Sequence, residues 1–269
     1  MSGFSAEWLA LREPYDLAAR NTTVLDAVVT AFTEQTSISV VDLACGTGAT
    51  LRTIGPHLPP RQSWRLVDND LSLLAKASAL GRPPDVTVIA KPVDLARDLE
   101  LALDGPLDLV TTSALLDLVS AEWLDRLVVE AAARRLPVYA ALSYDGRTST
   151  EPAGVLDREL LAGFDAHQRT DKGFGPALGP TAAARAIEQF EHVGYSVLEG
   201  RSDWIFGPDD RAVQDALFAG WAEIAALTTR LSSDEINGWL AQRRADLAAG
   251  RSHLRVGHVD IFARPIGTR

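Results

Sequence analysis

The stretch Val40-Val41-Asp42-Leu43-Ala44-Cys45-Gly46-Thr47-Gly48 decides the fold of this chain. Its first half is apolar and β-branched, which is typical of a strand that is buried on both faces. Its second half contains two glycines, and residues without a Cβ let the backbone turn tightly and lie close to a ligand. We therefore predict a strand that ends near Asp42 and turns directly into a helix beginning near Gly48.

Short apolar runs alternate with segments of helical period on the C-terminal side of this stretch. Parallel strands joined by crossover helices produce this alternation. The sequence therefore predicts an α/β fold with a doubly wound, mostly parallel sheet. The predicted strands are residues 38–43, 64–68, 86–90, 107–112 and 137–143, and the helices between them begin near Gly48, Asp70, Asp94 and Ser120.

The N-terminal segment predicts two helices, at residues 5–11 and 15–33. We place the break at Glu13-Pro14, because proline disfavours helical geometry in the residue before it. Residues 144–180 are rich in glycine and proline and have no clear period, so we expect an irregular substrate loop or lid there.

The remaining residues predict helices and strands that complete the same unit. The helices are expected at residues 181–193, 209–229 and 233–249, and the strands at residues 195–199, continuing towards Phe206, and 254–263. We interpret residues 1–269 as one domain. It comprises an N-terminal helical cap (1–36), a cofactor-binding core (37–143), and a region with the substrate loop, the last strands and the inserted helices (144–269).

The composition indicates which partners and which cellular compartment to expect. The formal net charge is -10, and a negative field repels phosphate backbones, so we expect no nucleic-acid partner. A single cysteine excludes an intrachain disulfide, which fits a reducing compartment. No apolar run approaches the roughly 20 residues of a membrane span, and the first residues lack the pattern of a signal peptide. We expect a cytoplasmic protein without a membrane partner.

The turn after Asp42 departs from the dinucleotide-binding pattern. That fingerprint places its third glycine where this sequence has Leu51. The stretch 40–48 instead closely resembles motif I of the class I S-adenosylmethionine-dependent methyltransferases, which are Rossmann-like. The resemblance extends well over residues 37–143 and loosely over the C-terminal strand pair. It implies a seven-stranded sheet whose last strand is antiparallel to the others, with S-adenosylmethionine as the cofactor.

The same resemblance assigns the cofactor-binding residues. It implies that Asp42 and the backbone of Ala44, Cys45, Gly46 and Gly48 hold the methionyl part. We interpret the Cys45 side chain as a small residue in the turn, since use of its thiol as a nucleophile needs a depressed pKa.

Acidic residues after the second and third strands extend this assignment. Asp68 lies roughly 20 residues after the glycines, where a carboxylate can accept hydrogen bonds from two ribose hydroxyls. The resemblance places Asn69 beside the adenine, and Asp94, followed by Leu95, at the adenine amino group. Asp70 is better interpreted as a helix N-cap, and an N-cap remains an alternative for Asp94.

Two further residues complete the predicted cofactor site. Ser113 follows the fourth strand, in a segment that resembles motif IV and lies beneath the sulfonium in similar enzymes. Arg20 in the N-terminal helix is a candidate partner for the cofactor's carboxylate, with an ordinary surface arginine as the alternative.

Catalytic candidates come from the region after the fifth strand. Methyl transfer depends mainly on positioning, and a general base is needed only when the acceptor carries a proton. We name Tyr144 and His167, the latter because histidine transfers protons near neutral pH. Arg169 and Lys172 are candidates to clamp an anionic substrate, and the alternative is a polar surface loop. The histidines outside this loop have no metal-ligand spacing, so we expect no metal site.

The sequence therefore predicts a methyltransferase that acts by in-line transfer on the oxygen or nitrogen of a small molecule, whose identity it leaves open. The segment after the fourth strand lacks the Asn-Pro-Pro-Tyr and Pro-Cys signatures of the related nucleic-acid base methyltransferases. A non-catalytic or regulatory protein that binds S-adenosylmethionine or S-adenosylhomocysteine remains the alternative, because fold does not settle function. A short-chain dehydrogenase ranks last, since the chain has no Tyr-x-x-x-Lys pair.

Overall fold

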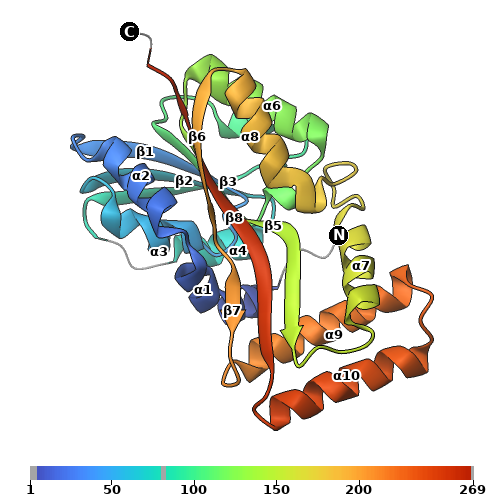
Figure 1. The fold of residues 1–269 in the computed structure, drawn as a ribbon. Helices are drawn as coiled ribbons and strands as arrows, with labels where there is room; N and C mark the ends of the chain where they lie inside the picture. The colour runs from blue at the N-terminus through green and yellow to red at the C-terminus, as the bar shows by residue number, and fades with distance from the viewer. Residues whose placement is uncertain (1–4, 80–82, 268–269) are drawn as a thin grey trace.

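The computed structural model describes residues 5–79 and 83–267, and its strands form one mixed sheet (Figure 1). The strands of the sheet are β1 (Ser37–Leu43), β2 (Arg61–Asp68), β3 (Val86–Pro92), β4 (Leu109–Ser113), β5 (Val138–Glu151), β6 (Tyr195–Arg201), β7 (Trp204–Phe206) and β8 (His253–Pro265). Their order is β3-β2-β1-β4-β5-β8-β6, and β7 also pairs with β8.

The strand directions confirm the predicted fold class. Each neighbouring pair from β3 to β5 is parallel, whereas β8 is antiparallel to β5, β6 and β7. The last strand is therefore antiparallel, as the sequence implied. Across the described ranges the sheet has eight strands rather than seven, because β7 is a separate short strand.

Helices cover both faces of the sheet and one of its ends (Figure 1). The α-helices are α1 (Ala6–Ala19), α2 (Thr22–Phe32), α3 (Ala49–Ile54), α4 (Leu71–Ser78), α5 (Leu99–Ala102), α6 (Ala121–Arg134), α7 (Asp157–Gln168), α8 (Ala182–His192), α9 (Arg211–Thr228) and α10 (Ser233–Ala248). Three short 3-10 segments are η1 (Gly55–His57), η2 (Leu116–Leu118) and η3 (Gly179–Thr181).

Successive side chains of β1 point to opposite faces of the sheet, so this one apolar strand contributes to two hydrophobic clusters. Val40 and Val41 are both fully buried, but their side chains belong to clusters on opposite faces of the sheet. Val40 packs with residues of α2, α3 and α4, and Val41 packs with residues of α5, α6 and α8. Successive side chains of a strand point to opposite faces, so a sheet covered on both sides needs apolar residues at both positions.

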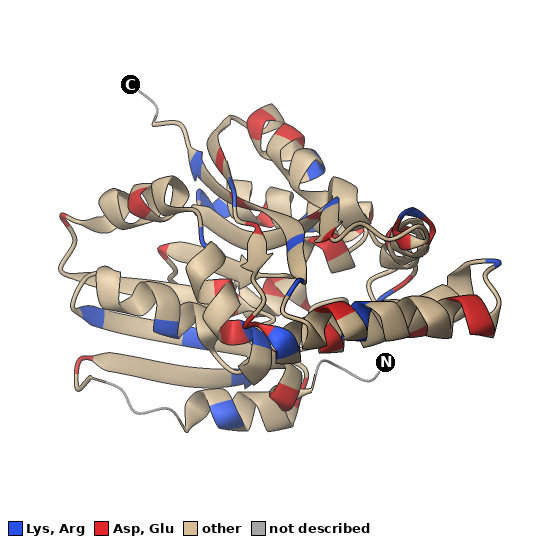
Figure 2. Cartoon of the chain, turned by 60° about the horizontal axis from the view of Figure 1, so that its bottom comes forward, with Lys and Arg blue, Asp and Glu red and all other residues tan. Residues whose placement is uncertain are grey.

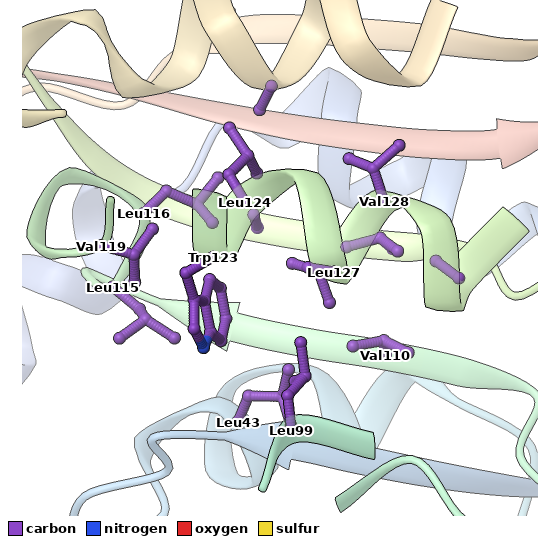
Figure 3. Packing of buried hydrophobic residues seen from close by; sticks show 14 of the residues in the cluster. Leu43, Leu99, Val110, Leu115, Leu116, Val119, Trp123, Leu124, Leu127 and Val128 are labelled. Atoms are coloured by element: carbon purple, nitrogen blue, oxygen red, sulfur yellow. The ribbon is translucent and has the colours of Figure 1, made fainter. Parts of the chain in front are cut away.

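Figure 3 shows the second of these clusters. Leu127 of α6 points towards the strand that contains Val110, and Leu99 of α5 lies beside Leu43 of the neighbouring strand, while Leu124 lies on another side of α6. Each of these side chains is fully buried. Burial of one such side chain contributes about 1.5–3 kcal/mol, so this layer holds the carboxyl ends of β1 and β4 in place.

A third apolar cluster joins the C-terminal helices to the far ends of the long strands. It contains buried residues of α7, α9 and α10 together with residues of β5, β7 and β8. Figure 1 shows these helices beside the extended ends of β5 and β8. Strands β5 and β8 therefore connect the sheet, which is covered by helices on both faces, to the C-terminal helices.

The predicted helix break at Glu13-Pro14 is wrong. Helix α1 is continuous through Pro14 and ends at Ala19, and Arg20 after it leaves the helical conformation with φ -50° and ψ 131°. Asn21 caps α2, because its side-chain oxygen accepts a hydrogen bond from the Val24 amide at 3.1 Å. Its side-chain amide also donates to the Arg201 carbonyl at 3.0 Å. Contacts at Asn21 therefore fix the break, rather than the local preference of proline.

The expectation of an irregular stretch across residues 144–180 is largely wrong. Strand β5 continues to Glu151 and is followed by α7, so the irregular part lies between α7 and η3. Polar residues are tolerated in this part of β5 because Arg147 forms ion pairs with Asp145 and with Asp203. Apolar side chains of α7 such as Leu160 pack into the C-terminal cluster, a contact that local periodicity does not reveal.

The helix expected near Asp94 begins later. Asp94 starts a turn in which its Oδ1 accepts a hydrogen bond from the Ala96 amide at 3.1 Å, and α5 begins at Leu99. The other three helix starts are confirmed, near Gly48, Asp70 and Ser120.

Charged residues of both signs are interspersed over the helices and strand ends (Figure 2). Arg126 pairs with Glu100, and Arg244 pairs with Asp215, each across two different elements. Many charges are therefore balanced locally despite the net charge of -10. Within residues 5–79 and 83–267, no helix has the length and apolar character needed to span a bilayer.

Candidate functional site

The turn between β1 and α3 has an unusual backbone conformation. Ala44, Gly46 and Gly48 all have positive φ, at 53°, 54° and 82°. An added Cβ at Gly46 would lie 3.2 Å from the Leu9 Cδ1 atom in α1. Positive φ is readily adopted by glycine and is strained for a residue with a Cβ such as Ala44. The glycines therefore shape a tight loop at the carboxyl end of β1, directly under the N-terminal helix.

Asp42 is buried beneath this loop. Its Oδ1 accepts a hydrogen bond from the Thr111 hydroxyl of β4 at 2.8 Å, and its Oδ2 has no hydrogen-bond partner within the described residues. Burial raises the pKa of Asp42 to about 7, against the opposing effects of Thr111 and the Arg20 charge. A buried carboxylate with an unpaired oxygen is costly, so this atom suits a ligand that donates a hydrogen bond or carries positive charge.

Asp68 connects the ends of β1 and β2. Its Oδ2 accepts a hydrogen bond from the Gly46 amide at 2.9 Å, and its Oδ1 accepts one from the Asp70 amide at 2.9 Å. Asp68 is only 9% exposed. An ionised carboxylate has about four acceptor sites, so two further hydrogen bonds can reach it.

Asn69 and Asp70 differ in their local surroundings. Asn69 is exposed next to Asp68. The Asp70 Oδ1 accepts hydrogen bonds from the Ser72 and Leu73 amides, which caps α4. The N-cap interpretation of Asp70 is therefore confirmed.

Asp94 and Leu95 lie beside the end of β2. The Val93 amide donates to the Asp68 carbonyl at 3.1 Å, which brings the segment after β3 to the same edge of the sheet. Asp94 is exposed there. The Leu95 side chain is buried in the apolar layer with α6, and its carbonyl accepts a hydrogen bond from Trp123 Nε1 at 2.6 Å. Leu95 therefore anchors this segment to the core.

Arg20 is buried, so the surface-arginine alternative is wrong. Its Nη2 donates to the Ser113 hydroxyl at 3.0 Å, and its Nη1 donates to the Tyr139 hydroxyl at 3.5 Å. Burial opposes the charge of Arg20, but Tyr139, Asp260 and Asp16 together raise its pKa above the usual value. The structure thus brings Arg20 and Ser113 together at the carboxyl end of β4.

Cys45 is buried within the glycine turn. Burial raises the pKa of its thiol, and the charges of Asp42 and Asp68 act in the same direction. A thiol in this environment stays protonated and is a weak nucleophile.

The two catalytic candidates lie at the junction of β5 and α7, the place where the Tyr144 side chain of β5 contacts Asp165 of α7. The Tyr144 hydroxyl donates to Asp165 Oδ1 at 2.7 Å, and burial raises its pKa. His167 lies near the end of α7 with Lys172 Nζ 3.1 Å from its Nδ1. Burial and then the Lys172 charge lower the pKa of His167, so the imidazole is neutral at physiological pH. Tyr144 is therefore held by a residue of α7, and His167 is held by a residue of the loop that follows α7.

Two buried residues near this junction were not identified from the sequence. Asp117, in η2, has 5% exposure, and burial raises its pKa to about 6. His258, in β8, has 5% exposure, and burial lowers its pKa to about 3. A signal for Asp117 was present, because it is a lone acid in the apolar run that follows β4. His258 lies in a strand far along the chain, so only the sheet pairing reveals its position.

Helix α1 covers the glycine turn and is connected to it by a charged contact. Arg52 of α3 donates to both carboxylate oxygens of Glu13, at 2.5 and 2.7 Å, and to the Thr47 carbonyl at 2.6 Å. Both side chains of the ion pair are about one-third exposed. The cover over the site is therefore held partly by an interaction that water can reach.

The described residues hold no cluster of three or more metal-ligating side chains. Two surface hollows, of about 430 and 620 Å³, lie against α6 and at the end of α2, and neither is lined by residues at the carboxyl ends of β1, β2 or β4.

Comparison with known proteins finds likeness in structure but not in sequence. No family model matches the chain, and no curated protein matches it. A cyclopropane-fatty-acyl-phospholipid synthase-like protein from Lactobacillus casei has a TM-score of 0.54 at 14% identity, covering 97% of this chain and 94% of that one. A SAM-dependent methyltransferase from Thiobacillus denitrificans, in complex with S-adenosyl-L-homocysteine, has a TM-score of 0.46 at 14% identity, covering 97% and 99%. A methyltransferase described as putative, from Bacillus halodurans, has a TM-score of 0.49 at 12% identity, covering 91% and 100%.

These comparisons bear on the fold. The likeness to the Lactobacillus casei structure, together with the strand order and the antiparallel β8, shows that the chain has the fold of class I S-adenosylmethionine-dependent methyltransferases.

Proposed function

We propose that this protein binds S-adenosylmethionine at the carboxyl ends of β1, β2 and β4 and transfers its methyl group to a small molecule. The observation that carries the proposal is the position of the Asp68 carboxylate, which is bound to the amide of Gly46 at 2.9 Å. This contact holds an acceptor of hydroxyl hydrogen bonds beside a glycine turn, whose backbone a ligand can approach closely.

The residues at these strand ends fit the parts of S-adenosylmethionine. Asp68 would accept hydrogen bonds from the ribose hydroxyls, because it has acceptor capacity left after its two backbone contacts. Asn69 and Asp94 are exposed beside it, where they would face the adenine, and Leu95 anchors the segment that contains Asp94.

The methionyl end would lie on the other side of the turn. Arg20 would bind the carboxylate, since its Nε is buried without a hydrogen-bond partner among the described residues. Asp42, with its unpaired Oδ2, would favour the positive charge of the ammonium and sulfonium groups. The backbone of Ala44, Cys45, Gly46 and Gly48, with Ser113 opposite, would complete this part of the site.

S-adenosylmethionine, when bound, supplies a methyl group on a sulfonium that leaves as a neutral thioether. The task of the chain is then to exclude water and to hold the acceptor oxygen or nitrogen in line with that methyl group. Tyr144 and His167 are proposed to act on the acceptor. Tyr144 is oriented by Asp165, and neutral His167 can accept a proton.

The alternative is a protein that binds S-adenosylmethionine or S-adenosylhomocysteine without catalysis. The same strand-end residues support it, and nothing about them requires turnover.

Calorimetric titration with S-adenosylmethionine, S-adenosylhomocysteine and NADH tests the proposal. We expect the first two to bind with micromolar or tighter dissociation constants and NADH not to bind. Incubation with methyl-labelled S-adenosylmethionine and a metabolite extract should then label a small molecule. Binding without any labelled product would favour the non-catalytic alternative, and binding of NADH alone would overturn both.

A further inference from the structure

Two buried polar atoms near the junction of β5 and α7 have no hydrogen-bond partner within residues 5–79 and 83–267. They are Oδ1 of Asp117 and Nδ1 of His258. Both side chains have only 5% exposure. Buried polar groups are nearly always paired, so two unpaired atoms in one region suggest a ligand that supplies the missing partners.

Asp117 and His258 come from distant parts of the chain but have neighbours in common. Asp117 accepts a hydrogen bond from the Tyr144 amide, and the His258 ring lies 6.1 Å from the Tyr144 ring between centroids. The charge of Arg12, in α1, acts on both Asp117 and His258. They therefore lie in one region beneath α1, near the end of β4.

Both unpaired atoms can accept a hydrogen bond. Burial lowers the pKa of His258 to about 3, so its imidazole is neutral, and Nδ1 carries a lone pair in the tautomer whose proton is on the other nitrogen. The carboxylate of Asp117 also accepts. The group that satisfies both must therefore bring two donors, such as hydroxyl or amine hydrogens.

Aromatic side chains pack around His258. The Trp204 ring lies 4.6 Å from the His258 ring between centroids, and the Tyr144 ring flanks it from another side. Aromatic rings offer apolar faces against which a planar ring can stack. Arg12 and Asp16 of α1 pair with each other there, and Asp16 accepts a hydrogen bond from Trp204 Nε1 at 3.0 Å. These contacts hold α1 against the aromatic residues of this region.

We propose, building on the function proposed above, that Asp117 and His258 form the subsite for the methyl acceptor, a small planar molecule with two hydroxyl or amine donors, and that Asp117, rather than His167, accepts the proton of the reacting donor. The new bond forms between the acceptor's oxygen or nitrogen and the methyl carbon. The bond from that carbon to the sulfur of S-adenosylmethionine breaks, and its electron pair stays on the sulfur. The acceptor's proton passes to Oδ1 of Asp117, and His258 holds the second donor.

A binding experiment that needs no turnover tests the subsite. The protein is saturated with S-adenosylhomocysteine and titrated with catechol, with 2-aminophenol and with 1,2-dimethoxybenzene, which has a similar shape but no donor. The nitrogen-15 resonances of His258 are followed by NMR. We expect catechol or 2-aminophenol to bind and to shift Nδ1, and 1,2-dimethoxybenzene to bind at least about tenfold more weakly.

Matched variants make the test specific. Asp117→Asn and His258→Gln should each weaken binding of the donor probes about tenfold or more, while S-adenosylhomocysteine binds as in the wild type. Asp117→Asn should also slow methyl transfer to the bound probe by about 100-fold or more. Asp26→Asn, at an exposed position on α2, should change neither property. Thermal melting checks that each variant is folded, and His258→Gln remains as a test if Asp117→Asn is not.

The outcomes separate the subsite from the function on which it depends. If S-adenosylhomocysteine binds but neither donor probe does, or if 1,2-dimethoxybenzene binds equally well, the subsite is overturned and the cofactor site stands. Equal probe binding by the wild type and both folded variants also overturns it. If S-adenosylhomocysteine does not bind the wild type, the proposed function fails and the subsite fails with it.

Discussion

The carboxylate of Asp68 accepts a hydrogen bond from the backbone amide of Gly46, with 2.9 Å between Oδ2 and N. The contact joins the end of β2 to the turn that follows β1, and a second contact to the Asp70 amide fixes the other carboxylate oxygen. Removal of the side chain therefore tests the turn and the proposed ribose contact together.

We expect Asp68→Ala to weaken binding of S-adenosylmethionine by about 1–3 kcal/mol, because ribose hydroxyls would lose a charge-assisted partner. Calorimetric titration of the folded variant measures this change. Asp70→Ala is the matched control, since Asp70 caps α4. It should lower the free energy of unfolding by about 1 kcal/mol and leave the dissociation constant unchanged. Equal affinity of Asp68→Ala and the wild type would show that the ligand lies elsewhere.

The glycine turn gives a prediction about folding. Gly46→Ala places a Cβ at φ 54° and 3.2 Å from Leu9, so we expect a loss of about 1–2 kcal/mol in the free energy of unfolding. Gly220→Ala, within α9 and with no atom within 4 Å of the new Cβ, should instead add about 0.5–1 kcal/mol. Urea denaturation compares the two. A neutral or stabilising Gly46→Ala would contradict the proposed role of the turn.

Asp42 gives a prediction about pH. Its folded pKa of about 7 lies above the ordinary value of 3.8, so the folded state holds the proton more tightly than the unfolded state. The resulting stability is fully present below pH 3.8 and is lost as pH rises towards 7. Asp42→Asn cannot ionise, so its melting temperature should exceed that of the wild type at about pH 8, and the difference should shrink towards about pH 4. Parallel pH profiles of the two proteins would exclude a raised pKa.

The ion pair between Glu13 and Arg52 gives a prediction about access. Its side chains are about one-third exposed, so Glu13→Gln should lower the free energy of unfolding by about 1 kcal/mol or less. Because the pair connects α1 to the loop it covers, we expect S-adenosylmethionine to dissociate several-fold faster in stopped-flow measurements. Glu100→Gln removes a comparable pair with Arg126 on another face and should leave the dissociation rate unchanged. The same rate in both variants would mean that α1 does not control release.

The sequence predicted the parallel core well because its signals are local there. The β-branched run around Val40 and Val41, the glycines after it and the caps at Asp70 and Ser120 all act within a few residues. The position of Asp68 at the same edge as Gly46 follows from parallel pairing of adjacent strands.

The errors lie where distant contacts override local preference. Helix α1 continues through Pro14, and β5 extends through polar residues because Arg147 pairs with Asp145 and with Asp203, which lies between β6 and β7. The burial of Arg20 beside Ser113 depends on how α1 packs onto the sheet, which no local pattern specifies. His258 was missed for the same reason, since it approaches Tyr144 only through the pairing of β5 with β8.

The most direct measurement is a crystal structure of the protein grown with S-adenosylhomocysteine. We predict electron density for the adenosyl group at the carboxyl ends of β1 and β2, with both ribose hydroxyls within hydrogen-bond distance of Asp68 and the amino-acid carboxylate on Arg20. If this edge is empty at saturating ligand, or if the ligand is bound at another place on the molecule, the account is contradicted.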